Sequence, residues 1–265
     1  MQNDRKSLFV SIVGKPNVGK SSMLNMIVNS KISIVSPKPQ TTRNKITGIL
    51  TQDNIQLVFT DTPGLLNPRS RLGNYMVSEI NNSFSGCEAC IHVVEAGKSI
   101  CNADLKLMDK FRKMKIPIIL VINKIDLLKD KSVIMEQIKD YTDKFEYFAV
   151  VPISAKSGNG REELIKELSN LAEPSVFFFD EDDITDQTER VLVSEVIREK
   201  MLHLLDKELP HGAAVFIEYF HERNDGMADI SAVIYCEREN HKAIIIGKGG
   251  RMLKNIGTLA RKELE

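Results

Sequence analysis

The sequence predicts an α/β fold with a doubly wound sheet over residues 1–173, followed by a small α+β unit. Three observations carry this prediction. Short apolar runs alternate with helical patterns through residue 173, an acidic stretch with a proline follows, and two alternating segments with basic helices come last. At 265 residues and 42% hydrophobic content, the chain is long enough for two compact cores. We therefore expect two domains, 1–173 and 188–265, joined by a linker over 174–187.

The first domain alternates expected strands with expected helices. The strands are 8–13, 46–51, 55–60, 90–95, 116–122 and 148–153, and the helices include 19–29, 102–115, 132–145 and 160–172. The connection 52–54 is a short hairpin, so the strands beside it form an antiparallel edge. The carboxyl ends of the remaining strands then lie at one edge of the sheet, where this fold class binds its ligand.

A phosphate-binding pattern follows the first strand. Residues 14–21, GKPNVGKS, match the P-loop pattern G-x-x-x-x-G-K-[ST]. A strand that turns through glycines into a helix directs backbone N–H groups and a helix N-terminus toward one point, which suits a polyphosphate. We therefore expect the chain to bind a nucleoside triphosphate.

A second motif, Asn123-Lys124-Ile125-Asp126, follows the strand at 116–122 and identifies the base. The carboxylate of Asp126 can accept hydrogen bonds from N1–H and the exocyclic amine of guanine, and adenine lacks that pair of donors on the same edge. A site built around a polar group rejects the analogue without its partner by roughly 10⁴-fold. Guanine is the expected base, and the motif argues against an ATP-dependent kinase.

Three further segments would complete the site. Asp61-Thr62-Pro63-Gly64 ends the strand at 55–60 and places a carboxylate where it can hold Mg²⁺ through water, with a glycine amide near the γ-phosphate. Ser154-Ala155-Lys156 brings backbone amides to the guanine O6, and Gln40-Thr41-Thr42-Arg43 offers a hydroxyl to the metal, for which we favour Thr42 over Thr41. Each segment alone also occurs as an ordinary turn. The occurrence of all five segments in the order that such a site needs along the chain favours a guanine-nucleotide switch.

The stretch between the domains is acidic and aromatic. Pro174 and the acidic run at 180–183 predict a solvated linker, in which the phenylalanines at 177–179 favour packing between the domains over contact with a membrane surface. An amphipathic helix is expected over 188–208. After it, alternating segments at 213–221 and 228–236 flank the turn Asn224-Asp225-Gly226.

A glycine-rich loop, GKGG at 247–250, separates the aliphatic run at 242–246 from a basic helix that begins at Arg251. Its glycines let a phosphodiester backbone approach the main chain, and the following helix offers free N–H groups to anionic oxygens. From Arg238 to Lys262 there are seven Lys or Arg residues and one acid, although the net charge of the chain is zero. A plain helix connection has the same pattern, but in this setting we favour single-stranded RNA binding.

With these motifs the chain resembles the Era-like family of translation-factor-related P-loop GTPases. The resemblance is carried by GKPNVGKSS, PQTTRNKI, DTPG, NKID, ISAKSG, TDQTERVLVSEVIREK and IIIGKGGRMLKNIGTLARKEL. It implies a Ras-like GTPase domain followed by a type II KH domain that binds small-subunit (16S) ribosomal RNA near its 3′ end. It also implies a role in assembly and maturation of the small (30S) subunit. In the family the second domain continues into another strand and a helix, so we expect the KH domain to be incomplete at Glu265.

The expected hydrolysis is slow. Leu65 stands where Ras-type switches have the glutamine that orients the attacking water, so catalysis would depend on Lys20, backbone amides and Mg²⁺. Related GTPases with an asparagine at the position of Asn17 use a potassium ion in place of an arginine finger, so the resemblance implies stimulation by K⁺.

The cellular setting follows from what the sequence lacks. No stretch approaches the ~20 apolar residues of a membrane span, and the N-terminus runs into a core strand, so we expect a cytoplasmic protein. We also expect a monomer. The resemblance adds a peripheral location on the cytoplasmic face of the inner membrane. Cys87 and Cys90 form a C-x-x-C pair without a second pair, which favours packed thiols over a metal site. A second domain that recruits a protein or lies on the membrane, with RNA incidental, is the alternative.

The predicted site residues fall into four sets. The catalytic set is Lys20, Asn17, Thr42 and Gly64. The set that contacts GTP or GDP is Gly14, Asn17, Val18, Gly19, Lys20, Ser21, Ser22, Asp61, Thr62, Pro63, Gly64, Asn123, Lys124, Asp126, Ser154, Ala155 and Lys156. The metal set is Ser21, Thr42 and, through water, Asp61, and the RNA set is Gly247, Lys248, Gly249, Gly250, Arg251 and Lys254.

Overall fold

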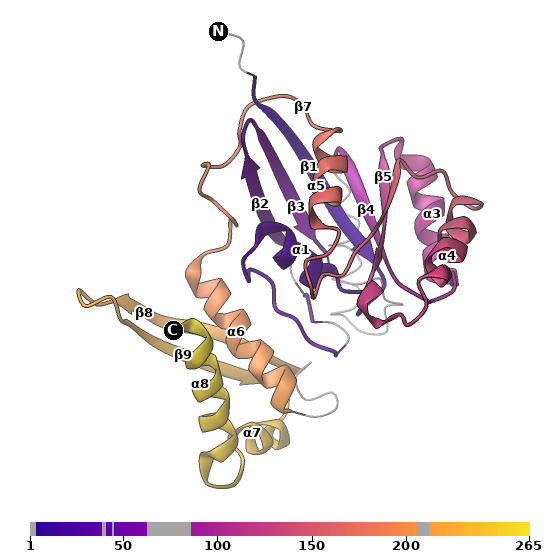
Figure 1. The fold of residues 1–265 in the computed structure, drawn as a ribbon. Coiled ribbons are helices and arrows are strands. Elements are labelled where there is room, and N and C mark those ends of the chain that lie inside the picture. The colour runs from indigo at the N-terminus through magenta and orange to yellow at the C-terminus, as the bar shows by residue number, and fades with distance from the viewer. Residues whose placement is uncertain (1–3, 39–40, 44, 63–85, 206–211) are drawn as a thin grey trace. The chain divides into compact units, whose positions relative to one another are not determined.

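The computed structural model describes residues 4–38, 41–43, 45–62, 86–205 and 212–265 (Figure 1). The chain divides into two compact units. The first consists of Met1–Ser33 and Thr42–Asp186, and the second consists of Ile34–Thr41 and Gln187–Glu265.

A mixed sheet forms the centre of the first unit, with strand order β2-β3-β1-β4-β5-β6. Its strands are β1 (Lys6–Gly14), β2 (Ile46–Gln52), β3 (Ile55–Asp61), β4 (Ala89–Glu95), β5 (Ile118–Asn123) and β6 (Ala149–Pro152). β1, β3, β4, β5 and β6 run parallel, whereas β2 is antiparallel to β3. The doubly wound sheet and its antiparallel edge are as predicted.

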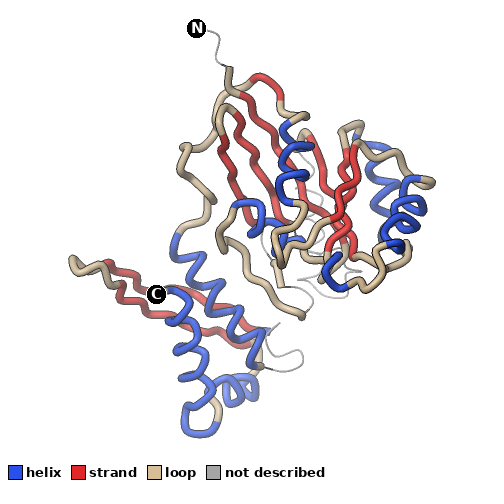
Figure 2. Tube along the Cα trace, in the orientation of Figure 1, coloured by secondary structure: helices blue, strands red, loops and turns tan. Residues whose placement is uncertain are grey.

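Helices cover both faces of this sheet (Figures 1 and 2). The helices are α1 (Lys20–Val28), α3 (Asn102–Met114), α4 (Ser132–Thr142) and α5 (Arg161–Ser169). Alternation along β5 shows how the sequence produces two cores. Ile119 and Val121 pack in the cluster that contains α1 and α5, whereas Leu120 and Ile122 pack in the cluster that contains α3 and α4. Because β5 is apolar on both faces, it is a buried central strand.

The stretch expected as a solvated linker lies along the first unit for most of its length. A short strand, β7 (Glu173–Pro174), pairs antiparallel with the start of β1. The side chain of Gln56 accepts hydrogen bonds from the backbone N–H groups of Phe178 (2.8 Å) and Phe179 (3.1 Å) and donates to the Phe179 carbonyl (3.0 Å). The ring of Phe178 packs edge-on against Phe9, with centroids 4.9 Å apart. These aromatics therefore pack within the first unit, rather than between domains as expected.

The second unit contains α6 (Glu189–Leu204), the hairpin β8 (Ala213–Glu222) and β9 (Ala228–Cys236), α7 (Glu239–Ile246) and α8 (Arg251–Leu264). Its elements occur in the predicted order. Its core cluster is formed by Met201, Leu205, Ala213, Ile245 and Ile256. Each of the three helices and the hairpin thus contributes to one small core. The second unit also includes the segment Ile34–Thr41.

Candidate functional site

The P-loop connects β1 to α1 at the carboxyl edge of the sheet. Gly19 has a φ of 96°, and a Cβ at this residue would lie 2.2 Å from Asn123 Nδ2, so a side chain cannot be accommodated. The buried Lys20 donates from Nζ to the carbonyls of Lys15 (3.0 Å) and Gly14 (3.4 Å). Burial lowers the pKa of Lys20 to about 8, against the opposing effect of Asp61. A phosphate at the loop would supply the counter-charge that a buried ammonium requires.

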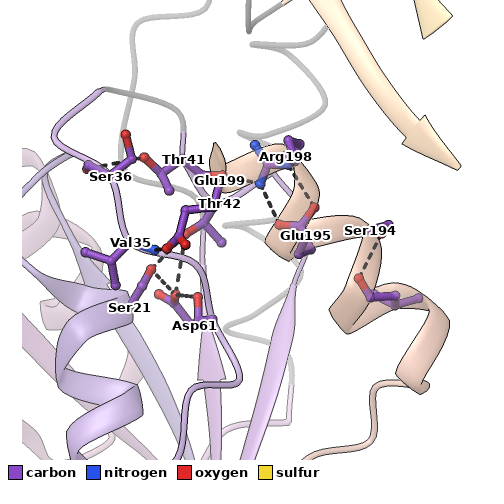
Figure 3. Close-up of polar contacts among 12 residues, drawn as sticks. Ser21, Val35, Ser36, Thr41, Thr42, Asp61, Ser194, Glu195, Arg198 and Glu199 are labelled. Carbon is purple, nitrogen blue, oxygen red and sulfur yellow. Dashed lines mark hydrogen bonds and ion pairs between the residues drawn. The ribbon is translucent and has the colours of Figure 1, made fainter. Parts of the chain in front are cut away.

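Three side-chain oxygens meet beside the P-loop, and we call Ser21, Thr42 and Asp61 the oxygen cluster (Figure 3). Asp61 Oδ2 accepts from Ser21 Oγ (2.6 Å) and Thr42 Oγ1 (3.5 Å), and the two hydroxyls lie 2.9 Å apart. Burial raises the pKa of Asp61, while Lys20 and the hydroxyls act in the opposite direction. Asp61 Oδ1 is buried and has no hydrogen-bond partner among the described residues. This set of hard oxygen donors suits Mg²⁺, so the predicted metal residues are brought together.

Asn123 joins three loops of the site. Its Nδ2 donates to the Val18 carbonyl of the P-loop (2.8 Å), and its Oδ1 accepts from the backbone N–H groups of Lys124 (2.8 Å) and Ala155 (3.0 Å). The side chain is buried, at 1% exposure, so water does not compete for these bonds. Sequence reasoning assigned Asn123 to the nucleotide but missed this structural role, because Val18 and Ala155 lie far from Asn123 in the sequence.

The predicted base-binding residues lie beside this joint. Asp126 follows β5 on a short 3₁₀ turn and is exposed, and its Oδ1 accepts from Ser154 Oγ at 2.6 Å. Lys124 has a left-handed backbone (φ 69°) and pairs with Glu95 at 2.8 Å, and Lys156 is exposed. A fixed carboxylate next to the Ala155 amide offers an acceptor and a donor, as the N1–H and O6 of guanine require.

The other predicted nucleotide residues differ in where their side chains go. Asn17 is exposed with a φ of 64°, while Ser22 is half-buried in α1. Thr62 is buried, and its hydroxyl donates to the Ile12 carbonyl at 2.8 Å, so this side chain is engaged with β1. Pro63-Gly64 lies outside the described residues, as do Leu65 and Gln40.

The segment before Thr42 belongs to the second unit, which sequence reasoning did not predict. Figure 3 shows its main chain beside α6: the Val35 N–H donates to Glu199 Oε1 at 2.9 Å, and Arg198 donates to the Thr41 carbonyl. His203 Nε2 also lies 3.1 Å from the Val35 carbonyl. We call Ile34–Thr41 the clasped segment. Its partners are more than 150 residues away in the chain, so no local pattern could have indicated them.

The predicted RNA loop lies at the start of α8. Gly247, Gly249 and Gly250 have φ angles of 71°, 61° and 76°, a backbone that favours glycine. Lys248, Arg251 and Lys254 are all exposed. The loop therefore presents positive side chains and a helix N-terminus to solvent together.

The cysteine pair shows the packing that we expected of it. Cys90 is buried and Cys87 is partly buried, and burial raises the pKa of both thiols. Within the described ranges, no cluster of three or more His, Cys, Asp or Glu side chains could hold a metal ion. Nor does the described part of the chain contain a helix that is long and apolar enough to span a membrane.

Comparisons with known proteins match both units. A family model described as 50S ribosome-binding GTPase matches residues 9–124, and a KH domain model matches residues 208–265. The chain is 49% identical over 261 residues to GTPase Era of Clostridioides difficile (strain 630), which covers 98% of this chain and 88% of that protein. GTPase Era of Thermoanaerobacter sp. (strain X514) is 46% identical over 263 residues, covering 98% and 86%.

Solved structures agree with these matches. A crystal structure of an Aquifex aeolicus Era variant bound to GDP and AlF₄⁻ superposes with a TM-score of 0.93 at 37% identity, covering 98% of this chain and 89% of that one. A crystal structure of Era with MgGDPNP and nucleotides 1506–1542 of 16S ribosomal RNA gives the same TM-score, identity and coverage. The predicted fold, a P-loop GTPase domain followed by a KH domain, is thus confirmed. This chain belongs to the Era family of GTPases.

Proposed function

We propose that this GTPase binds small-subunit ribosomal RNA near its 3′ end and assists assembly and maturation of the 30S subunit. One observation carries the proposal: a P-loop, an oxygen cluster and a base-binding motif that suit a guanine nucleotide occur in the same chain as an exposed, basic GKGG loop. The Era structure solved with MgGDPNP and nucleotides 1506–1542 of 16S ribosomal RNA supports it. The two activities would be exerted by separate units of the chain.

The nucleotide site supports hydrolysis of GTP to GDP and phosphate. The P-loop amides and Lys20 would bind the phosphates, and Asp126 with the Ala155 amide would select guanine. The oxygen cluster would hold Mg²⁺, which neutralises charge on the transferring phosphoryl group when it is bound. Because Lys20 is buried and tied to loop carbonyls, it is preorganised to stabilise the charge that develops on the phosphate oxygens.

Potassium is proposed as a second cation. Asn17 is exposed at the P-loop in a left-handed conformation, where its carboxamide oxygen is able to serve as a ligand for a monovalent cation next to the phosphates. A potassium ion there would take the place of an arginine finger. Loss of the K⁺ stimulation in Asn17→Ala would support this role.

We further propose that the nucleotide state reaches the RNA-binding unit through the clasped segment. Arg198 of α6 holds the Thr41 carbonyl, and the next residue is Thr42, whose hydroxyl belongs to the oxygen cluster. Mg²⁺ and a γ-phosphate would fix Thr42 and thereby one end of the clasped segment. Loss of the γ-phosphate would release the end at Thr42, while the contacts from α6 would continue to hold the rest of the clasped segment.

Binding of a labelled 3′-terminal 16S rRNA fragment, with GTP analogue or with GDP, tests the RNA function. We expect binding that weakens steeply with salt, is favoured by the GTP analogue, and is lost in Gly249→Asp. Gly226→Asp in the β8–β9 turn is the matched control, because both glycines have positive φ (61° and 81°) and open space for a Cβ. Equal loss in the two variants would indicate unfolding instead of a lost RNA contact.

If RNA binds in neither nucleotide state, the second unit has a function other than RNA binding. The chain would then be a GTPase whose second unit recruits a protein or contacts the membrane. Sedimentation with vesicles containing anionic lipid would detect the membrane contact. Location in the cytoplasm, peripheral contact with the inner membrane and a monomeric state remain predictions.

A further inference from the structure

A buried ionic group contacts the P-loop through Lys15. Asp104, in the first turn of α3, has a fully buried side chain, and its Oδ2 lies 3.1 Å from Lys15 Nζ. The same oxygen accepts from the Cys101 N–H at 3.0 Å, which caps α3. His92 of β4 is also fully buried and places Nε2 3.7 Å from Asp104 Oδ1. A charged carboxylate in such a place is stable only because it is paired.

The pairing keeps both groups charged. Burial alone would raise the pKa of Asp104, but the His92 ring, the Cys101 N–H and Lys15 together hold that pKa well below its usual range. For Lys15, burial acts to lower the pKa, and Asp104 outweighs it so that the pKa is raised. The ion pair therefore persists throughout the neutral pH range.

Lys15 is attached to the nucleotide site at its other end. It is the second residue of the P-loop, and its carbonyl accepts the hydrogen bond from Lys20 Nζ at 3.0 Å. Its main chain thus holds Lys20, while its ammonium is held by Asp104. A chain of contacts runs from the start of α3 through Lys15 to the lysine that meets the phosphates.

We propose that Asp104 is a positioning residue for nucleotide binding, which acts through Lys15 on the shape of the P-loop. A loop whose amides must converge on phosphate loses conformational freedom on binding unless it is already held. The Asp104–Lys15 pair holds Lys15, and with it the part of the loop whose carbonyl accepts from Lys20. Weakening the pair therefore speeds nucleotide release, in addition to its effect on the stability of the fold.

His92 and Tyr147 complete the support. The Tyr147 hydroxyl lies 2.9 Å from His92 Nδ1, and burial lowers the pKa of His92, so the ring is neutral. Nε2 of His92 and Oδ1 of Asp104 lie 3.7 Å apart, are both buried, and form no hydrogen bond with a described residue. The ring therefore places a polar group near the second carboxylate oxygen, which the capping role of Asp104 alone would not require.

The competing interpretation is that Asp104 only caps α3. Lys15→Met separates the two roles, because it removes the ammonium and leaves the contact between Asp104 and the Cys101 N–H in place. Lys15→Arg retains a positive charge and serves as the rescue variant. Asp109→Asn, which removes the charge from an exposed pair with Arg112 on the same helix, is the matched control.

The experiment measures release of fluorescent GDP and the midpoint of thermal unfolding in the full chain. In Lys15→Met and Asp104→Asn we expect release to be faster by about tenfold, with no further increase in the double variant, because both changes break one interaction. Lys15→Arg and Asp109→Asn should release GDP at close to the wild-type rate. The inference rests on guanine-nucleotide binding, which the wild-type measurement establishes independently of the variants.

Two results would overturn the inference. A wild-type release rate in Lys15→Met, with Asp104→Asn altered only in thermal stability, would leave Asp104 as a helix cap. Additive effects of the two substitutions on release would show that they act through separate contacts.

Discussion

Replacing Asn123 with alanine tests the claim that one side chain holds the nucleotide site together. The substitution removes the donor to the Val18 carbonyl and the acceptor for the Lys124 and Ala155 N–H groups. Each lost bond leaves a buried or partly buried backbone group without its partner, at a cost of about 1 kcal/mol or more. We therefore expect the free energy of unfolding to fall by about 3 kcal/mol.

Nucleotide affinity should fall as well, because the P-loop and the base-binding loops lose their common anchor. If misalignment of these loops reduces the binding free energy by only about 1.4 kcal/mol, GDP affinity falls tenfold. Urea unfolding followed by circular dichroism gives the stability, and titration with fluorescent GDP gives the affinity.

The control is Asn54→Ala, which removes one hydrogen bond (2.7 Å, to the Asp4 carbonyl) near the surface of the same unit. It should cost well under 1 kcal/mol of stability and leave GDP affinity unchanged. An Asn123→Ala protein with less than about 1 kcal/mol of destabilisation and normal GDP affinity would refute the reasoning, since the loops would then hold one another without the carboxamide.

Three further predictions concern cations, pH and coupling. GTP hydrolysis should be faster in K⁺ than in Na⁺ and should lose this difference in Asn17→Ala, and equal rates in both salts for the wild type would rule the idea out. Because burial lowers the pKa of His92, the unfolded chain takes up a proton near pH 6.5 that the folded chain does not, so stability should decrease as the pH falls below about 6.5. His92→Phe should reduce the dependence of the unfolding free energy on pH by up to about 1.4 kcal/mol per pH unit, measured by urea unfolding between pH 7 and 5. An unchanged pH dependence would show that another group takes up the proton. Arg198→Met should reduce the preference of RNA for the GTP-analogue state by about fivefold. The control Arg190→Met changes an exposed residue in the first turn of α6 and should preserve this preference. An intact preference in both variants would exclude the clasped segment as the route by which the nucleotide state reaches the RNA-binding unit.

The sequence predicted those parts of the molecule that depend on local pattern. Apolar runs followed by glycine- or polar-rich turns indicated strands, and parallel strands necessarily bring their carboxyl ends to one edge. Ser21 and Asp61 follow two such strands, so their meeting could be inferred. The meeting of Thr42 with them depended on a choice between two neighbouring threonines in the segment 40–43.

Contacts between distant segments could not be predicted in this way. Gln56 looked like one polar residue in a strand, and nothing nearby indicated that its carboxamide would bind the backbone at 178–179. Asp104 looked like an ordinary acidic residue in the first turn of a helix. The pairing of Asp104 with Lys15 requires β4, α3 and the P-loop to be assembled first.

The division of the chain into units has a consequence for attempts to separate them. The covalent backbone passes from one unit to the other three times, after Ser33, after Thr41 and after Asp186. Cutting within the acidic stretch therefore severs only one of three connections. A fragment that ends at Asp186 would keep Ile34–Thr41 but lose Glu199 and Arg198, which bind its main chain. In such a fragment the main chain that precedes Thr42 would lack these contacts. A hydrolysis rate measured on the fragment would therefore not give the rate of the intact chain.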